Sequence, residues 1–397
     1  MKFRRSLIAV VCALTASGAF AQTQALNYES KEISTVLKVG GVNYAWDRGI
    51  TGRGSTIAIL DNGFDLTHSD FAGKIAASRN FNSVIAAQNP SNPTAVTWGW
   101  HGTLMSGIAA ANNNGAGTVC VSPDAKLLFA QVGQGGTSTS IEMAAVYKAI
   151  DWASANNATV INLSLGASFD ANFQKQMTLV TPGIWKAPTG YGSMYGYTMK
   201  DVNAFAVGTN RGSIIVAAAG NQALPYAQFP GAFATQVDST GKLVLGGRML
   251  IVGATDTTGT VIAPFSNRAG HICTNLVGTT CNDPYQVKDF FVVAPGMQVY
   301  GSMANQMNMG VNGSTAVQGT SPAAAYVSGG IALMKQAWPQ LRPEQLVAVV
   351  LNTAKDLGAK GDPFGMNVTV TFEKVAIAPA GGPSTGPATT PTRDTHR

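Results

Sequence analysis

The sequence contains little charge for its length. Charged residues make up 12% of its 397 residues, and the formal net charge is +6. Three of the positive charges, on Lys2, Arg4 and Arg5, lie at the start of the chain. The positive balance left to the rest of the chain is too small to indicate a nucleic-acid partner.

Beyond its N-terminus the sequence has no apolar run long enough to span a bilayer. The N-terminus itself combines the positive start with an apolar core over residues 7–14 and with Ala19-Phe20-Ala21, which resembles a cleavage site. We therefore predict a signal peptide over residues 1–21, no membrane span, and a mature chain that is secreted or periplasmic.

Cysteine is also scarce, with four residues in the chain. Cys12 belongs to the predicted signal peptide. Cys273 and Cys281 close a short polar loop, and in an exported protein this spacing predicts a disulfide. Cys120 lies between two valines, which predicts a buried thiol; a nucleophilic role for it is the weaker alternative.

Hydrophobic residues are plentiful at 45%, so the chain can bury a large core. Short apolar runs alternate with helical patterns, which favours an α/β fold with a mostly parallel sheet and helices on both faces. Ligands of such sheets bind beyond the carboxyl ends of the strands. The predicted strands are Ser55–Leu60, Lys126–Val132, Thr159–Leu165, Ser213–Ala219, Met249–Ala254 and Phe290–Val293. The predicted helices begin near His101 and Ser321 and cover Ile141–Ser154 and Asp201–Gly208.

We predict one domain over residues 22–378, followed by a disordered tail over residues 379–397 that is rich in Pro, Gly and Thr. Two regions are predicted insertions, at residues 168–200 and 267–289. The first contains glycines that alternate with aromatics, which is typical of a surface loop. Contact with a ligand and packing on its own domain both remain open for that loop. Near the start of the domain, a helical face is predicted to end at Gly49.

Ser321 stands at the start of a predicted helix, after the turn Gly319-Thr320. Pro322 suits the first helical turn, because its missing N–H has no intrahelical partner there. A serine in this place is either an N-cap or a nucleophile at the positive end of the helix dipole. The nucleophile requires a histidine base and a group that orients the histidine.

Among the four histidines, His101 is the best candidate for that base. His396 lies in the tail, His271 lies in the cysteine loop, and His68 lies in a polar loop where a structural hydrogen bond is expected. His101 opens a predicted helix among small residues, which would allow it to approach a serine. A structural role for His101 is the alternative.

Two further polar residues end buried strands. Asp61 precedes Asn62 and Gly63, so it either caps its own turn or orients a catalytic histidine. Asn221 ends the run from Ile214, so it either forms a turn or offers its side-chain amide to an oxyanion. The backbone N–H of Ser321 would be the second oxyanion donor.

Asp61, His101 and Ser321 follow one another in the order found in subtilisin. With the motifs around them, the chain resembles the subtilisin-like (subtilase) serine peptidases over roughly residues 40–355. Two later stretches look most like secreted subtilases that occur as autotransporter passengers. The matching motifs are Ile57–Gly63, His101–Gly107, Val160–Gly166, Ala217–Asn221 and Gly319–Ala324, and the two later stretches are Phe265–Gly270 and Val292–Gly296.

The resemblance implies a subtilisin-like three-layer fold and a serine endopeptidase that acts on proteins or peptides through an acyl-enzyme. It also implies a monomer that needs no cofactor and no metal for its chemistry. Subtilases often bind structural calcium, but the sequence has no dense ligand motif for it. The implied residues are the triad Asp61, His101 and Ser321, the oxyanion donor Asn221, and Ser164, Leu165 and Gly166 as substrate-binding residues that border the S1 pocket.

The sequence departs from the family pattern at two places. Asn62 replaces the small residue usual after the aspartate, and we expect a modest effect. Pro322, Ala325 and Tyr326 replace residues usual after the serine, and these could reshape the pocket beside it. The segment between the predicted cleavage site and residue 40 is too short for the family's usual inhibitory propeptide.

Two rival functions stay open. A pseudopeptidase would keep the fold and bind peptides without turnover. A lipase or esterase would also use a serine triad, but its serine would lie in G-x-S-x-G and its triad would follow another order.

Overall fold

The computed structural model describes the central part of the chain. The predicted signal peptide, the rest of the first 39 residues and the predicted tail lie outside the described residues. No helix in the part that the model describes is both long and apolar enough to cross a bilayer. The described residues are 40–114, 118, 120–166, 171–188, 197–305, 314–357 and 368–369.

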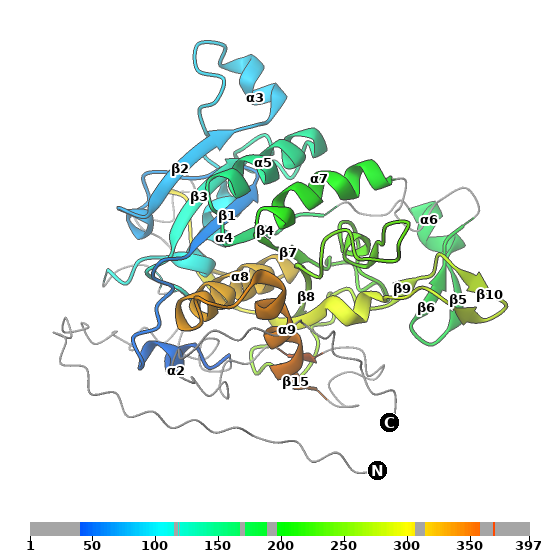
Figure 1. The fold of residues 1–397 in the computed structure, drawn as a ribbon. Coiled ribbons are helices and arrows are strands. Elements are labelled where there is room, and N and C mark those ends of the chain that lie inside the picture. Colours follow the sequence, from blue (N-terminus) through cyan, green and yellow to red (C-terminus); the bar gives the residue numbers. More distant parts are fainter. Residues whose placement is uncertain are drawn as a thin grey trace. The chain divides into compact units, whose positions relative to one another are not determined.

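A nine-stranded sheet forms the centre of the fold, in the order β15-β16-β12-β8-β7-β4-β1-β3-β2 (Figure 1). Neighbouring strands run parallel, except that β15 and β16 are antiparallel. The strands are β1 (Thr56–Asp61), β2 (Ile75–Asn80), β3 (Lys126–Gln131), β4 (Val160–Leu163), β7 (Ile214–Ala218), β8 (Met249–Thr255), β12 (Phe291–Pro295), β15 (Lys355–Asp356) and β16 (Val368–Thr369).

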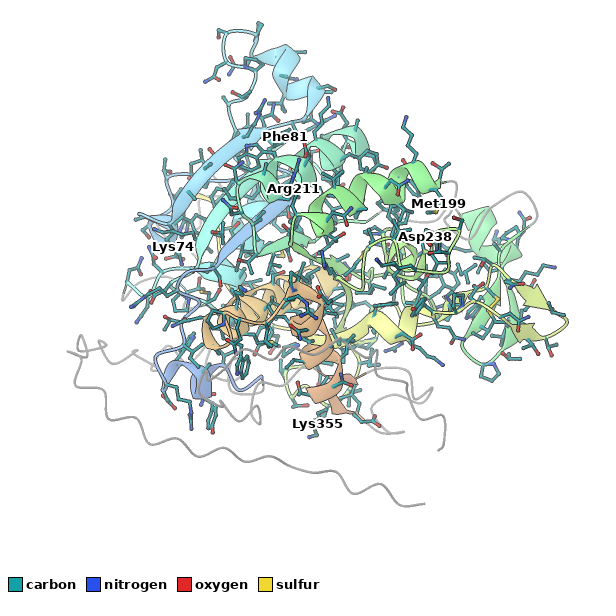
Figure 2. All side chains as sticks on the ribbon, in the orientation of Figure 1. Lys74, Phe81, Met199, Arg211, Asp238 and Lys355 are labelled. Atoms are coloured by element: carbon teal, nitrogen blue, oxygen red, sulfur yellow. A yellow bond between two sulfur atoms is a disulfide. The ribbon has the colours of Figure 1, made fainter. Side chains whose placement is uncertain are left out.

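Helices cover both faces of this sheet, which confirms the predicted three-layer α/β fold. Helices α5 and α7 lie on one face and α4, α8 and α9 on the other, and side chains fill the space between the layers (Figures 1 and 2). The alternation of side chains along strand β1 shows why both faces of the sheet are covered. Ile57 and Ile59 pack with α4 and α8, whereas Ala58 and Leu60 pack with α5, and all four are fully buried. The helices are α4 (Trp100–Ala110), α5 (Met143–Ala155), α7 (Met199–Asn210), α8 (Thr320–Ala337) and α9 (Pro343–Thr353).

Each of the six predicted strands is found, within one or two residues of its predicted ends. Strand β2 was not predicted, because it is an edge strand of partly exposed residues without an apolar run. Figure 2 labels Lys74 and Phe81, which flank it. Of the predicted N-terminal helical face, the structure describes α2 (Val42–Trp46), and Gly49 beyond it has a φ of 72°. The remaining elements of the main body are η1 (Ser69–Phe71), α3 (Ser83–Gln88), η2 (Gly231–Thr235), η3 (Val287–Phe290), β13 (Val299–Ser302) and β14 (Ser314–Val317).

The two predicted insertions meet in a small second sheet. Strand β5 (Thr178–Thr181) is antiparallel to β6 (Ile184–Lys186), and β6 is parallel to β9 (His271–Ile272). The prediction of a loop from Gly183 onward is therefore wrong for β6, whereas residues 189–196 lie outside the described residues. Helix α6 (Ala171–Gln176) precedes this sheet, and the hairpin of β10 (Leu276–Val277) and β11 (Thr280–Cys281) follows it.

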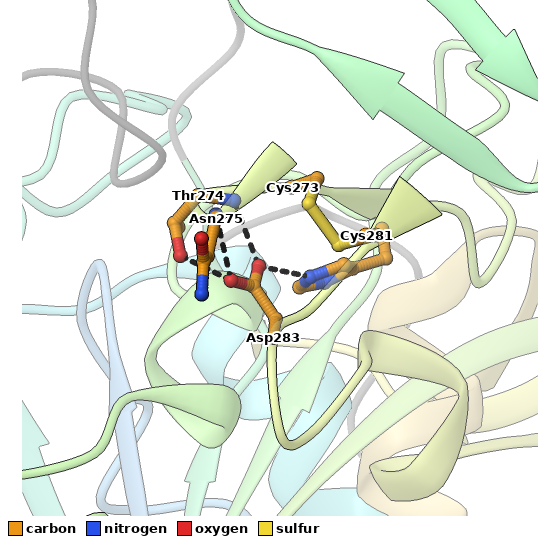
Figure 3. The surroundings of a disulfide bond; sticks show 6 residues. Cys273, Thr274, Asn275, Cys281 and Asp283 are labelled. Carbon is orange, nitrogen blue, oxygen red and sulfur yellow. Dashed lines mark hydrogen bonds and ion pairs between the residues drawn. A yellow bond between two sulfur atoms is a disulfide. The ribbon is translucent and has the colours of Figure 1, made fainter. Parts of the chain in front are cut away.

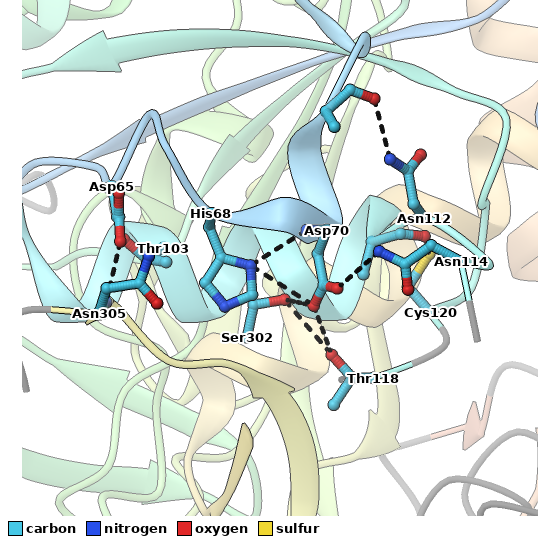
Figure 4. Close-up of polar contacts among 12 residues, drawn as sticks. Asp65, His68, Asp70, Thr103, Asn112, Asn114, Thr118, Cys120, Ser302 and Asn305 are labelled. Carbon is cyan, nitrogen blue, oxygen red and sulfur yellow. Dashed lines mark hydrogen bonds and ion pairs between the residues drawn. The ribbon is translucent and has the colours of Figure 1, made fainter. Parts of the chain in front are cut away.

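A buried polar cluster around His68 and Asp70 stabilises the segment after β1 (Figure 4). His68 has the structural role expected of it, since its Nδ1 accepts a hydrogen bond from the Asp70 backbone N–H at 3.2 Å and caps η1. The Asp70 carboxylate accepts hydrogen bonds from Ser302 at 2.5 Å, Thr118 at 3.3 Å and Asn114 at 3.4 Å. These contacts connect η1 with β13 and with the segment after α4, so that the backbone following Asp61 is held in place.

Candidate active site

Asp61 and His101 form a hydrogen-bonded pair beyond the carboxyl end of β1. His101 Nδ1 lies 2.8 Å from Asp61 Oδ1 and 2.9 Å from Oδ2. The Asp61 side chain is 3% exposed and that of His101 is 23% exposed, so the imidazole alone reaches the surface. With Nδ1 donating to the carboxylate, the neutral imidazole keeps Nε2 as an acceptor, which is the arrangement that a general base requires.

The pair is close because α4 begins directly against the turn after β1. A Cβ on Gly102 would lie 2.2 Å from the Gly63 carbonyl oxygen, so this approach requires glycine. Asn62 adds a direct tie, since its Oδ1 accepts from the Gly102 N–H at 3.2 Å and its Nδ2 donates to the Ser138 carbonyl at 2.9 Å. The residue that departs from the family pattern therefore joins the aspartate's turn to the histidine's helix.

The pKa of His101 reflects two opposing effects. Burial acts to lower it, but the charge of Asp61 and the hydrogen bond to its carboxylate act to raise it, and the net pKa is raised. The backbone N–H of Asn62 also donates to Asp61 Oδ1 at 2.7 Å. The carboxylate is thus held by fixed donors and favours a positive imidazole.

Ser321 is the second residue of α8 and is half-buried. Its Oγ donates to the Ser164 carbonyl at 3.2 Å, and Ser164 Oγ donates in turn to the Ser321 carbonyl at 2.9 Å. No hydrogen bond joins Ser321 Oγ to His101 among the described contacts. Catalytic hydrogen bonds are often long or misaligned without substrate, so this resting position is compatible with a nucleophile.

Two successive buried hydrogen bonds hold the side chain of Ser164 in place. Ser328 Oγ donates to Asn162 Oδ1 at 3.0 Å, and Asn162 Nδ2 donates to Ser164 Oγ at 2.9 Å. The sequence reasoning did not single out Asn162, although an asparagine inside the apolar strand Val160–Leu163 is itself a signal. These hydrogen bonds connect the middle of α8 to the end of β4.

Asn221 follows β7 and is exposed. Its Oδ1 accepts from the backbone N–H of Thr320 at 2.8 Å and from Thr320 Oγ1 at 2.9 Å. An atom that accepts from a backbone N–H is the oxygen, so the orientation of the amide is fixed and its NH2 group is left to donate. Thr320, which sequence reasoning passed over, therefore orients the candidate oxyanion donor.

The other predicted substrate-binding residues lie at the end of β4. Ser164 and Leu165 are buried, and Gly166 is exposed. Strand β4 pairs with β1 on one side and β7 on the other, so these residues follow a strand that lies between β1, which ends at Asp61, and β7, which precedes Asn221. The structure thus places all seven predicted site residues at one edge of the sheet or at the start of the helices that meet it.

The cysteine loop follows β9 and contains the β10–β11 hairpin. Cys273 and Cys281 are joined by a disulfide, and His271 Nε2 lies 2.7 Å from Asp283 Oδ2 beside it (Figure 3). Burial acts to raise the pKa of Asp283, but hydrogen bonds from His271 and Thr274 outweigh it and lower the pKa to about 2. Within the described residues, the group suited to a metal is His271, Cys281 and Asp283, and the disulfide occupies its sulfur.

Cys120 is buried, as predicted, with 2% of its surface exposed. Its thiol donates to the Ala111 carbonyl, and burial raises its pKa to about 12. A thiol that stays protonated at neutral pH is a poor nucleophile. Cys120 is therefore part of the core.

Known proteins match this chain over most of its length. It is 27% identical to Fervidolysin from Fervidobacterium pennivorans over 84% of this chain and 42% of that protein. It is 27% identical to the Extracellular serine protease of Serratia marcescens over 82% of this chain and 32% of that protein. The chain therefore spans less than half the length of these two relatives. It is 28% identical to Subtilisin Savinase from Lederbergia lenta, over 79% of this chain and 88% of that protein.

Solved structures agree on the fold. The Prenylagaramide maturation protease PagA superposes with a TM-score of 0.57 at 19% identity, over 82% of this chain and 92% of that chain. A cold adapted subtilisin-like serine proteinase superposes with a TM-score of 0.53 at 20% identity, over 81% of this chain and 89% of that chain. The model of the Subtilase family, peptidase family S8, matches residues 52–366. This chain belongs to the subtilase family of serine peptidases.

Proposed function

We propose that this protein is an exported serine endopeptidase that cleaves peptide bonds through an acyl-enzyme intermediate. The observation that carries the proposal is the buried Asp61 carboxylate, which holds His101 Nδ1 at 2.8 Å at the sheet edge where α8 presents Ser321. A buried carboxylate is costly unless it is paired, and here its partner is an imidazole whose other nitrogen is available as a base.

In the proposed mechanism Ser321 Oγ turns from the Ser164 carbonyl toward His101 and attacks the scissile carbonyl. His101 Nε2 takes the serine proton and later gives it to the leaving amine, while Asp61 keeps the imidazole in the required tautomer. Asn221 Nδ2 and the Ser321 backbone N–H donate to the oxyanion. A water molecule then hydrolyses the acyl-enzyme by the same route.

The substrate backbone is proposed to lie along residues 164–166. This segment continues β4 beyond its pairing with β7, and Gly166 is exposed. An extended peptide adds to such a free segment through backbone hydrogen bonds. We propose that Leu165 and Gly166 border the S1 subsite, and that the chemistry needs neither a cofactor nor a metal and is performed by a monomer.

Export is supported by the relatives and by the disulfide. One relative is named an extracellular protease, and the Cys273–Cys281 disulfide is typical of oxidising compartments. We propose that residues 1–21 direct the chain out of the cytoplasm.

The deciding experiment compares the purified mature protein with its Ser321→Ala variant on casein and with a fluorophosphonate probe. The wild type should cleave casein and be labelled at Ser321, and the variant should do neither, with a loss in kcat of roughly 10⁶. A folded wild type that neither cleaves nor labels would favour the pseudopeptidase. Labelling with turnover of small esters, but without cleavage of any internal peptide bond, would favour an esterase.

A further inference from the structure

The side-chain amide oxygen of Gln228 is buried and has no hydrogen-bond partner among the described residues. The residue is 6% exposed, and its backbone N–H donates to the Ala219 carbonyl at 2.9 Å. Its side-chain Oε1 is buried and accepts no hydrogen bond from any described residue. Buried polar atoms are satisfied in the great majority of cases, so an exception points to a missing partner.

The amide lies between the ends of β4 and β7. A Cβ on Gly166 would lie 2.0 Å from Gln228 Nε2, and a Cβ on Gly220 would lie 2.6 Å from its Cδ and 2.7 Å from its Oε1. Two glycines thus lie directly against the amide, at positions where a side chain would collide with it. Gly220 directly precedes the candidate oxyanion donor, and Gly166 belongs to the segment proposed to bind the substrate backbone.

A neighbouring amide shows the contrast. Asn267 also lies against Gly220, but its Nδ2 donates to the Ala219 carbonyl, and its Oδ1 accepts from the backbone N–H groups of Gln222 and Leu224. Asn267 therefore satisfies its hydrogen bonds within the protein. Gln228 lies beside the same glycine, but its Oε1 has no hydrogen-bond partner in the part of the protein that the structure describes. Its amide is therefore the one of the two that is available to a ligand.

We propose that Gln228 is a specificity-determining residue, whose amide binds the side chain of the residue that donates the scissile carbonyl, the P1 residue. The inference rests on the proposed peptidase function and adds a substrate class to it, namely peptides with an uncharged, hydrogen-bonding P1 side chain such as glutamine or asparagine. An amide both donates and accepts, so a second amide is its full complement.

Other P1 side chains fit this environment less well. An aliphatic or aromatic P1 side chain would leave the amide of Gln228 unpaired in a desolvated site, and a site built to hydrogen-bond its substrate rejects such analogues. A charged P1 side chain would lose its hydration next to the uncharged amides of Gln228 and Asn267, without a counter-charge from either.

The test uses peptide para-nitroanilides that differ only in P1, with glutamine, leucine, phenylalanine, lysine or alanine there. For the full mature wild type, kcat/KM for glutamine should exceed that for leucine by roughly tenfold to a hundredfold. In Gln228→Leu this ratio should fall at least tenfold, and Gln228→Gly should lose the preference for glutamine in the same way. Normalising each value to the alanine substrate removes differences in the amount of active enzyme.

Gln236→Leu is the matched control, because Gln236 follows η2 and bonds the Ala232 carbonyl away from both glycines. It should keep the wild-type ratios. A wild type that prefers leucine, phenylalanine or lysine overturns the proposal while the peptidase stands, and so does an unchanged ratio in a folded Gln228 variant. If the wild type cleaves nothing and the fluorophosphonate does not label Ser321, the proposed function fails, and the specificity inference fails with it.

Discussion

Replacing Asp61 by asparagine tests whether Asp61 orients His101, as the proposed mechanism requires. The side chain keeps its size, and its oxygen can still accept from the Asn62 backbone N–H. The other terminal atom becomes an NH2 group. In the wild type both carboxylate oxygens lie within 2.9 Å of His101 Nδ1, so this NH2 group would be close enough to donate to Nδ1. His101 would then accept at Nδ1 and carry its proton on Nε2, where it could no longer take the proton of Ser321.

The expected loss in kcat is about 10⁴, the effect of the wrong tautomer in a serine triad, which corresponds to about 5 kcal/mol of transition-state stabilisation. The pKa of His101 should also fall, because the charge that raises it is gone. The acid limb of the kcat/KM profile, which lies above the ordinary histidine value in the wild type, should therefore move to lower pH.

The assay measures kcat and kcat/KM for a peptide substrate between pH 5 and pH 10, with thermal unfolding as the control for folding. A folded variant that retains more than a tenth of the wild-type kcat would refute the orienting role of Asp61. An acid limb that stays in place would refute the assignment of His101 as the base whose ionisation it reports.

Three further changes test the surroundings of the site. Thr320→Val removes the Oγ1 hydrogen bond at 2.9 Å to Asn221, so kcat should fall at least tenfold with KM nearly unchanged, and an unaltered kcat would contradict the orienting role of Thr320. The pKa of Asp283 is lowered from 3.8 to about 2, so its stabilisation, roughly 2 kcal/mol, is present above pH 4 and is lost as the pH falls toward 2. Asp283→Asn should therefore lower Tm at pH 7, with the difference closing near pH 2, and a constant difference would contradict this linkage. Replacing Cys273 and Cys281 by serine should lower the free energy of unfolding by roughly 2–3 kcal/mol in urea titrations, and an unchanged midpoint would contradict the constraint by the disulfide.

The fold was predictable where burial on both faces dictates the sequence. Strands β1, β7 and β8 are apolar runs because neither face meets water, and each was located within a residue or two. Strand β2 lies at the sheet edge with alternate residues exposed, so its composition differs little from that of a loop. The sheet of β5, β6 and β9 pairs segments more than 80 residues apart, and short strands of this kind carry no local signal of their partner.

The candidate site divides in a similar way. Asp61, His101, Asn221 and Ser321 were identified because each follows a recognisable strand or opens a helix. Thr320, Asn162 and Gln228 were not, because their roles depend on contacts between elements that are distant in the chain. A threonine before a serine or a glutamine in a loop has no distinctive pattern, and only the packed structure shows which carbonyl or amide it meets.

The positions of two helix N-termini give a reason why the proposed mechanism needs a buried carboxylate. Ser321 and His101 are each the second residue of a helix, in α8 and α4 respectively. In the proposed mechanism, the partial positive charge at a helix N-terminus would stabilise the oxyanion beside Ser321 but would disfavour the imidazolium on His101. Asp61, 2.8 Å from Nδ1, opposes that second effect. Burial lowers the pKa of His101, but the Asp61 charge and its hydrogen bond together raise the net pKa. In the proposed mechanism, at a pH above the pKa of His101, the imidazolium forms only as Ser321 gives up its proton. The Asp61 charge would then act mainly in the transition state, so its loss should reduce kcat far more than substrate binding.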